Sequence, residues 1–227
     1  MSDLFYRLVR AVGTPAIAMS AQPRLRGFEH IPRRGPCIIA ATHGSPIDVA
    51  LLIRHTPRLL DFVSITEVFA RPLLGRFYGA LNAFPLERAR PDPATVRTIL
   101  TRLERGRCVA MFPEGRIQRG DASALRSGRI RPGVGRIATL ARVPVIPCVI
   151  LNSAAYEHAA AWAPLRRTRY VVHYLPSLSP DLGATEIEER LLAAWRATAL
   201  EHAAFIPASF PPRPAKHPPE PPATSSP

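Results

Sequence analysis

The clearest pattern in the chain is a series of short apolar runs separated by polar turns and by longer stretches of helical periodicity. Cys37–Ala41 is apolar and is bounded by Gly35-Pro36, so it predicts a buried strand. The other predicted strands are Leu25–Ile31, Asp61–Thr66, Ala80–Glu87, Cys108–Phe112, Val143–Leu151 and Tyr170–Leu175. Pro144 and Pro147 favour an edge or a bulge for the run at 143–151, because proline cannot donate a ladder hydrogen bond.

Helices are expected between these strands. Ser45 followed by Pro46, with Asp48 three residues after the serine, is typical of a helix start, and this helix is expected to end near His55–Pro57. The other predicted helices run from Asp92-Pro93 to Gly106, over Val134–Ala141 and from Thr185 to about Ala204, with a short helix or pair of turns at Phe69–Tyr78. Strands that alternate with helices predict an α/β domain whose central sheet is mixed and largely parallel, flanked by helices.

The two ends of the chain differ from this middle part. Residues 1–22 place Leu4, Leu8 and Val12 on one face of a basic amphipathic helix, which could lie in a lipid interface or pack on the core of the domain. From residue 207 the chain is rich in Pro, Ser and Ala without periodicity, so 207–227 is expected to be a disordered tail. Residues 23–206, between these ends, are expected to form the single functional domain.

The composition limits the possible partners. The chain has 227 residues, a formal net charge of +13 and only one lysine, Lys216, so its positive charge is carried by arginine. This charge favours an anionic partner such as phosphate head groups, a phosphorylated substrate or nucleic acid. Aromatic residues make up 7% and do not interleave with basic ones, which argues against nucleic acid.

Cysteine usage and hydropathy indicate the compartment. The three cysteines are odd in number and lack CxxC spacing, so we expect buried free thiols and neither a disulfide frame nor zinc; no metal is expected. No run approaches the ~20 apolar residues that a spanning helix needs. The N-terminus does not resemble a secretory signal. We therefore expect a cytoplasmic protein that is soluble or peripheral on the inner face of the cell membrane.

Candidate chemistry follows the predicted strand ends. His43 lies between a strand and a helix start, and Asp48 is five residues away across the turn. Asp48 could orient the imidazole as a general base, or it could merely cap the helix, and the two roles are compatible. Arg88 follows the third core strand, and Glu114 and Arg116 follow the fourth. If these strands are parallel neighbours, the three sets meet at one edge of the sheet.

Four ordered blocks carry a resemblance to a known family. They read HGSPID at His43–Asp48, AFPLER at Ala83–Arg88, FPEGR at Phe112–Arg116 and VPVIPC at Val143–Cys148. Over roughly residues 25–180, the sequence resembles the glycerolipid acyltransferases, whose best-known members are lysophosphatidate acyltransferases. IRPGVGRIA, residues 130–138, is similar to the family segment between the third and fourth blocks.

This resemblance implies a role for each matching residue. His43 would deprotonate the acceptor hydroxyl and Asp48 would orient His43. Arg88 would hold the acceptor phosphate, in a pocket completed by Glu114, Gly115 and Arg116 or Arg119, because the sequence leaves open which of these two arginines meets phosphate. Residues expected to shape the site against the acyl chain are Ser45, Pro113, Val145 and Pro147.

The expected reaction moves a fatty acyl group from an acyl-CoA or acyl-carrier-protein thioester to a lysophospholipid, most simply 1-acylglycerol-3-phosphate, giving phosphatidate. The thioester is a co-substrate and no cofactor is expected; an anionic membrane surface and possibly the carrier protein are the expected partners. A covalent intermediate is disfavoured because the chain has no Gly-x-Ser-x-Gly elbow and no cysteine paired with histidine. The alternatives are acylation of another lysolipid such as lyso-ornithine lipid, non-catalytic phospholipid binding, and hydrolysis by the same His–Asp pair.

Overall fold

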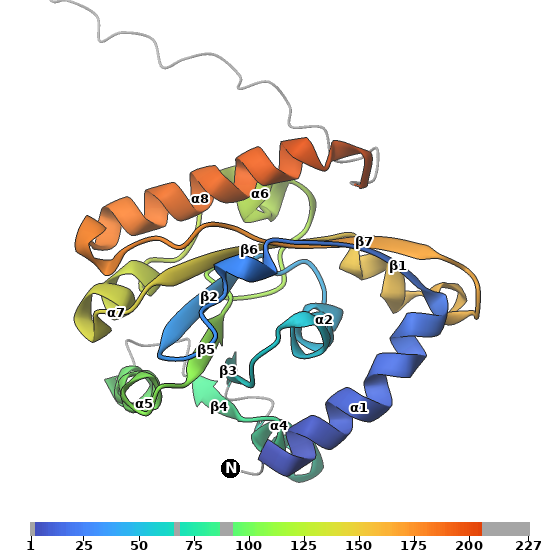
Figure 1. Ribbon diagram of the computed structural model, residues 1–227, viewed down its shortest axis with the longest axis horizontal. Coiled ribbons are helices and arrows are strands. Elements are labelled where there is room, and N and C mark those ends of the chain that lie inside the picture. The colour runs from blue at the N-terminus through green and yellow to red at the C-terminus, as the bar shows by residue number, and fades with distance from the viewer. Residues whose placement is uncertain (1–2, 66–68, 87–92, 206–227) are drawn as a thin grey trace, which may run out of the picture.

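The computed structural model describes residues 3–65, 69–86 and 93–205, which form a seven-stranded sheet covered by helices on both faces (Figure 1). The predicted tail at 207–227 and Arg88 lie outside these described residues. The strands are β1 Ala21–Arg26, β2 Cys37–Ala41, β3 Leu60–Ile65, β4 Ala83–Leu86, β5 Cys108–Met111, β6 Val145–Leu151 and β7 Thr168–Tyr174. Their spatial order is β1-β7-β6-β2-β5-β3-β4. Every neighbouring pair is parallel except β6 and β7, which confirms the predicted mixed and largely parallel sheet.

The helices form two layers around the sheet (Figure 1). They are α1 Asp3–Ser20, α2 Ile47–His55, α4 Pro72–Ala80, α5 Pro93–Glu104, α6 Ala124–Ser127, α7 Val134–Ala141 and α8 Ala184–Glu201. Short 3₁₀ segments lie at Phe28–His30, Gly120–Ala122, Ser153–Glu157, Ala159–Trp162, Pro180–Leu182 and Ala203–Phe205. One apolar core lies between the sheet and α1 and α2, and the other lies between the sheet and α5, α6, α7 and α8. None of the described helices is long and apolar enough to cross a membrane.

The prediction that residues 143–151 form an edge strand is wrong, whereas the predicted bulge has a counterpart beside Pro147. The strand β6 is internal, between β2 and β7. The carbonyls of β6 alternate between its neighbours: Cys148 accepts from the Thr42 N–H on the β2 side, whereas Pro147 accepts from the Leu175 N–H on the other side. The pairing on the β7 side is offset by one residue here, since Cys148 pairs with Tyr174 but Val145 pairs with Leu178, and the missing N–H of Pro147 falls at this offset.

The N-terminal helix packs on the core and also leaves apolar side chains exposed. Tyr6 and Ile17 are buried, whereas Leu4, Leu8 and Val12 are mostly exposed. The helix continues through Pro15. The helix therefore packs on the core, and its contact with a lipid interface stays a prediction.

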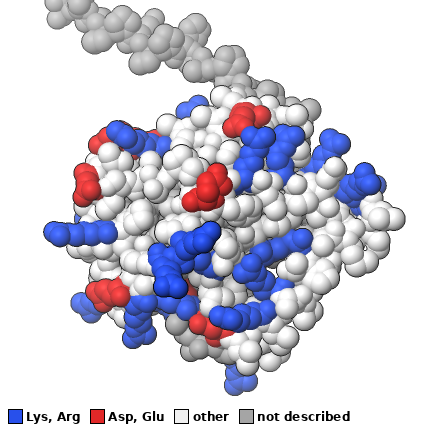
Figure 2. Space-filling model, in the orientation of Figure 1, with Lys and Arg blue, Asp and Glu red and all other residues white. Residues whose placement is uncertain are grey.

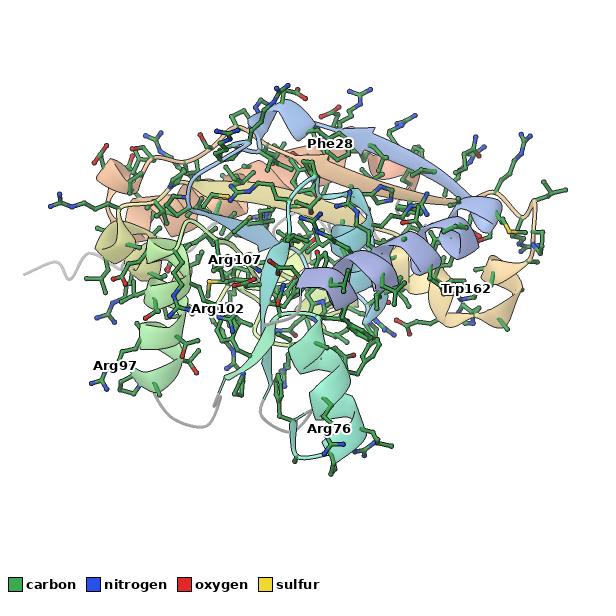
Figure 3. All side chains as sticks on the ribbon, turned by 60° about the horizontal axis from the view of Figure 1, so that its bottom comes forward. Phe28, Arg76, Arg97, Arg102, Arg107 and Trp162 are labelled. Atoms are coloured by element: carbon green, nitrogen blue, oxygen red, sulfur yellow. The ribbon has the colours of Figure 1, made fainter. Side chains whose placement is uncertain are left out.

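A buried charge cluster anchors the start of α1 to the sheet. Asp61 on β3 is fully buried and accepts hydrogen bonds from Arg102 at 2.7 Å and from Arg107 at 2.6 Å. Both arginines are labelled in Figure 3. Arg107 also binds Asp3, and this hydrogen bond is the main reason why the pKa of Asp3 is lowered. The cluster satisfies a buried carboxylate that would otherwise be strongly destabilising.

All three cysteines are buried and unbridged, as expected from their number and spacing.

Candidate active site

The strands β2 and β5 bring the first and third sequence blocks together. They are adjacent and parallel, with Cys37 opposite Cys108, so the segments that follow them leave the same edge of the sheet. Thr42 fixes the exit from β2: its hydroxyl accepts from the Ile150 N–H at 2.8 Å and donates to the Ile150 carbonyl at 3.1 Å. His43 and Glu114 consequently meet at this edge, as the parallel arrangement requires.

His43 and Asp48 lie within hydrogen-bond distance. The Nδ1 atom of His43 is 3.0 Å from the Oδ2 atom of Asp48, which also accepts the Ser45 N–H at 2.9 Å. Asp48 is fully buried, and the imidazole stacks on Phe112 with ring centroids 4.0 Å apart. Asp48 therefore caps the turn and contacts the imidazole at once, and Nε2 is the ring nitrogen left outside this contact.

Glu114 holds the turn that carries His43. Its carboxylate is 3% exposed and accepts the His43 N–H at 2.8 Å and the Ala124 N–H at 2.9 Å. Burial raises the pKa of Glu114, and these two N–H bonds partly oppose the rise. Both oxygens are directed at backbone amides, so this position suits a residue that shapes the pocket.

The loop after Glu114 closes over the same turn. The Gln118 N–H donates to the His43 carbonyl at 2.9 Å, and Nε of Arg119 donates to the Gly44 carbonyl at 2.8 Å. The other end of the Arg119 guanidinium pairs with Glu157. Arg116 and Arg119 are both exposed.

Two residues near this loop were not predicted from the sequence. Glu157 also hydrogen-bonds the side chain of Ser45, which is the main cause of its lowered pKa, followed in the same direction by Arg119. Arg131 lies against Gly115: a Cβ on this glycine would be 2.5 Å from Cδ of Arg131. Gly115 also has a φ of +71°, which favours glycine. Neither contact has a local sequence signal, because the partners are separated along the chain.

The residues expected to shape the site are divided between two places. Ser45 and Pro113 are buried at the site, where the Pro113 carbonyl accepts the Arg131 N–H at 2.8 Å. Val145 belongs to the core beneath α8, on the sheet face opposite α2, and alternation places Pro147 on the same face. The structure therefore does not bring these two β6 side chains together with His43.

An apolar cavity of about 170 Å³ adjoins the first turn of α2. It lies between α1, α2 and α4, and its lining includes Val9, Gly13, Pro46, Val49 and Ala50. Pro46 and Val49 flank the stretch that contains Asp48, so the cavity begins beside the His–Asp turn.

The comparison with protein families matches the same region. The family model described as Acyltransferase covers residues 22–151, more than half of the chain. The chain belongs to the acyltransferase family. The match runs from β1 to the end of β6 and thus contains both the His43–Asp48 turn and the Glu114 loop.

Individual acyltransferases are similar over this region. A 1-acyl-sn-glycerol-3-phosphate acyltransferase of Bacillus subtilis is 28% identical over 130 residues, covering 57% of this chain and 59% of the relative. The chloroplastic 1-acyl-sn-glycerol-3-phosphate acyltransferase BAT2 of Brassica napus is 26% identical over 57% of this chain and 37% of its own length. The alignments thus span less than two thirds of these relatives.

The fold also matches a solved acyltransferase structure. The 1-acyl-sn-glycerophosphate acyltransferase PlsC from Thermotoga maritima superposes with a TM-score of 0.68 at 20% identity, covering 88% of this chain and 80% of that one. This likeness extends the shared fold beyond the family match, into β7 and α8.

Proposed function

We propose that this acyltransferase moves a fatty acyl group from an acyl-CoA or acyl-carrier-protein thioester to the free hydroxyl of 1-acylglycerol-3-phosphate. The observation that carries the proposal is the 3.0 Å contact between His43 Nδ1 and Asp48 Oδ2 at the end of β2. The names of the relatives support the acceptor, since they are 1-acyl-sn-glycerol-3-phosphate acyltransferases.

The reaction needs one proton to move. With Asp48 accepting from Nδ1–H, the Nε2 lone pair of His43 takes the proton of the acceptor hydroxyl while its oxygen attacks the thioester carbonyl. Collapse of the tetrahedral intermediate breaks the C–S bond, and the proton on Nε2 passes to the leaving thiolate. His43 is thereby returned to its starting state.

Direct transfer is favoured over an acyl-enzyme. The three cysteines are buried, and burial raises the pKa of Cys148, the cysteine whose pKa also responds to the charge of Asp48. A raised thiol pKa keeps the sulfur protonated and poorly nucleophilic.

Arginines beside the turn are suited to the acceptor phosphate. Arg116 is exposed, and Arg131 lies against Gly115 on the same loop. Arg119 is held by the Gly44 carbonyl and by Glu157, so it must exchange a partner before it can bind an anion. We therefore favour Arg116 and Arg131 as the first phosphate ligands among the described residues, with Arg88 as the ligand that the sequence resemblance adds.

The acyl chain is assigned to the apolar cavity between α1, α2 and α4. A thioester whose carbonyl lies at His43 can direct its chain past Pro46 and Val49, which line the cavity. Each methylene buried there contributes about 0.8 kcal/mol, so cavity length would select chain length.

The apolar stripe on α1 is the proposed membrane contact. Its exposed residues, Leu4, Leu8, Val12 and Met19, run along the helix. In Figure 3 this helix crosses the front of the molecule, with Arg76 of α4 near one end and Trp162 near the other. Leu73 of α4 and Leu165, 81% and 84% exposed, lie on segments that contact α1, because Phe77 of α4 packs on Phe5 and the Leu165 N–H donates to the Met19 carbonyl. Arginines outnumber acidic residues on the face shown in Figure 2, which suits an anionic bilayer.

Vesicle sedimentation tests this contact. The double variant Leu8→Ser with Val12→Ser is expected to bind anionic vesicles more than about tenfold less tightly, since each side chain contributes up to roughly 1.5–3 kcal/mol when buried. Leu140→Ser, equally exposed but on α7, is the matched control and should bind like the wild type. Equal losses in both would remove α1 from the interface.

The catalytic proposal is tested with purified protein, acyl thioester and lysophosphatidate. His43→Ala should lower the rate by about 10²–10⁴-fold, the contribution of a positioned base, while the circular dichroism spectrum stays unchanged. A folded and fully active variant would end the assignment. Thioester cleavage without an acceptor would instead indicate a hydrolase, and phosphatidate binding without turnover a binding protein.

A further inference from the structure

A pair of histidines lies outside the His43–Asp48 turn. His173 is on β7 and His202 follows α8, and the Nδ1 atom of His173 is 3.1 Å from the Nε2 atom of His202. Glu201 adds a carboxylate, so that one ligand atom from each of the three residues lies within 4.8 Å of the other two. His202 is 1% exposed, whereas Glu201 is exposed and leaves the cluster open on one side.

This cluster is on the other face of the sheet from the His43 turn. Tyr170, Val172 and Tyr174 of β7 belong to the core that contains α2. Val171 belongs to the core beneath α8, and alternation places His173 on that face. In Figure 1 the C-terminal end of α8 lies above β7, with α2 below the sheet. The cluster is therefore separate from the proposed catalytic site.

The spacing of the two nitrogens fits one metal ion. Zinc–nitrogen bonds of about 2.0–2.1 Å at a tetrahedral centre put two ligand nitrogens roughly 3.3 Å apart. The pair at 3.1 Å thus needs little movement, and the Glu201 oxygen, 4.0 Å from His202 Nε2, needs only a side-chain rotation. We propose that His173, His202 and Glu201 form a binding site for a divalent transition-metal ion such as Zn²⁺, with water as the fourth ligand.

Both histidines can adopt the form that binds a metal. A histidine binds a metal through an unprotonated ring nitrogen, so each ring must be neutral when it does so. Both facing nitrogens, Nδ1 of His173 and Nε2 of His202, must be unprotonated to bind the metal. Each neutral ring then carries its proton on its second nitrogen, Nε2 of His173 and Nδ1 of His202. The His202 Nδ1 atom is buried and has no hydrogen-bond partner among the described residues, so no contact there fixes the opposite tautomer.

The charges around the cluster predict how substitutions would change its affinity for a metal ion. Arg26 pairs with Glu201 at 3.3 Å, and both side chains are about half exposed. Arg24 and Arg26 contribute positive charge that opposes a cation. The C-terminal end of α8 favours a cation through its helix dipole. A bound metal would take Glu201 from Arg26, so removal of the Arg26 charge should tighten binding.

Metal binding is measured on the full chain after treatment with EDTA. We expect one Co²⁺ per chain with the intense visible absorption of tetrahedral Co²⁺, and displacement of this absorption by Zn²⁺. His173→Ala should weaken Zn²⁺ binding by more than about 10–100-fold, the cost of losing even an outer partner of a metal ligand. Arg26→Gln should shift the affinity in the opposite direction. His158→Ala removes an exposed histidine outside the cluster and is the matched control.

Three results would overturn the proposal: no Co²⁺ binding by the wild type, binding unchanged by His173→Ala in a folded variant, or weaker binding in Arg26→Gln. Glu201→Gln gives a second check, since it keeps the shape and removes the anionic ligand, and unchanged binding there would remove Glu201 from the site. Because the readout is spectroscopic and calorimetric, the outcome is independent of the proposed acyl transfer.

Discussion

Glu114→Gln separates the positioning of His43 from its chemistry. The carboxylate accepts the N–H groups of His43 and Ala124, and it is 3% exposed. Glutamine can accept only one of these with its carbonyl, and its NH₂ group would face the other donor. A buried hydrogen bond to a charged acceptor is worth about 1.5–3 kcal/mol. Removing a buried charge, whose cost is evident in the raised pKa, offsets part of this loss, so we expect a net loss of about 1–2 kcal/mol.

Urea unfolding and thermal melting measure this change. For a chain of this size, 1–2 kcal/mol lowers the melting temperature by about 2–8 °C. The transfer rate should fall as well, because the turn that carries His43 loses an anchor. Glu186→Gln on α8 is the control, since Glu186 makes only an exposed pair with Arg190, worth about 0.3–0.5 kcal/mol. Equal stability and equal rates in Glu114→Gln and wild type would refute the anchoring role.

The pH dependence gives the same variant a second signature. Because the folded state raises the pKa of Glu114, the folded chain binds this proton more tightly than the unfolded chain does. The wild type therefore loses stability as pH rises from the unfolded pKa through the higher folded pKa, and glutamine has no such loss. The stability advantage of the wild type over the variant should be larger near about pH 4 than near pH 7. An advantage that grows toward pH 7 would contradict the direction of the pKa shift.

Three further variants test other contacts. Glu157→Gln releases Arg119 from an ion pair but keeps a polar group near Ser45; the KM for lysophosphatidate should fall up to about fivefold, with kcat little changed, in steady-state assays. Gly135→Ala would place a Cβ 2.1 Å from the Ala184 carbonyl oxygen where α7 meets α8, and urea unfolding should show a loss of about 1–3 kcal/mol. Gly13→Leu should fill part of the cavity, because a Cβ there meets nothing within 4 Å; excluding two or three methylenes would lower kcat/KM for long-chain thioesters by roughly 10–60-fold, with short-chain thioesters as the control.

The parts of the fold that follow local rules could be predicted from the sequence. Cys37–Ala41 is an apolar run ended by turn residues, and the strand has these bounds in the structure. His43 and Asp48 are joined by a five-residue turn with helix-start signals, so their contact depends on local geometry. The proline rule allowed an edge or a bulge at β6, and only the edge is wrong, since the pairing beside Pro147 is offset by one residue within an internal strand.

Contacts between distant segments could not be predicted in this way. Glu157 reaches Arg119 across 38 residues, from a 3₁₀ segment after β6 with no distinctive pattern. Val145 illustrates the opposite error, since the sequence block that contains it enters the sheet with this side chain on the face away from His43. Side-chain direction depends on which face each neighbouring strand presents, and this is fixed only when the sheet is assembled.

The contact between Glu114 and His43 gives a physical reason for two of the sequence blocks to occur together. They are 71 residues apart, yet the carboxylate of the third block binds the backbone N–H of the first block's histidine. The Gln118 N–H returns a bond to the His43 carbonyl, so both polar groups of this peptide segment are held by the FPEGR loop and the residues that follow it. A base that must face a substrate cannot be anchored through its ring alone, because Asp48 fixes one nitrogen but leaves the backbone free to shift. With the backbone fixed as well, the N–H, the carbonyl and Nδ1 of His43 all have hydrogen-bond partners among the described residues, and Nε2 remains for the substrate. The proposed proton transfer uses this Nε2 atom.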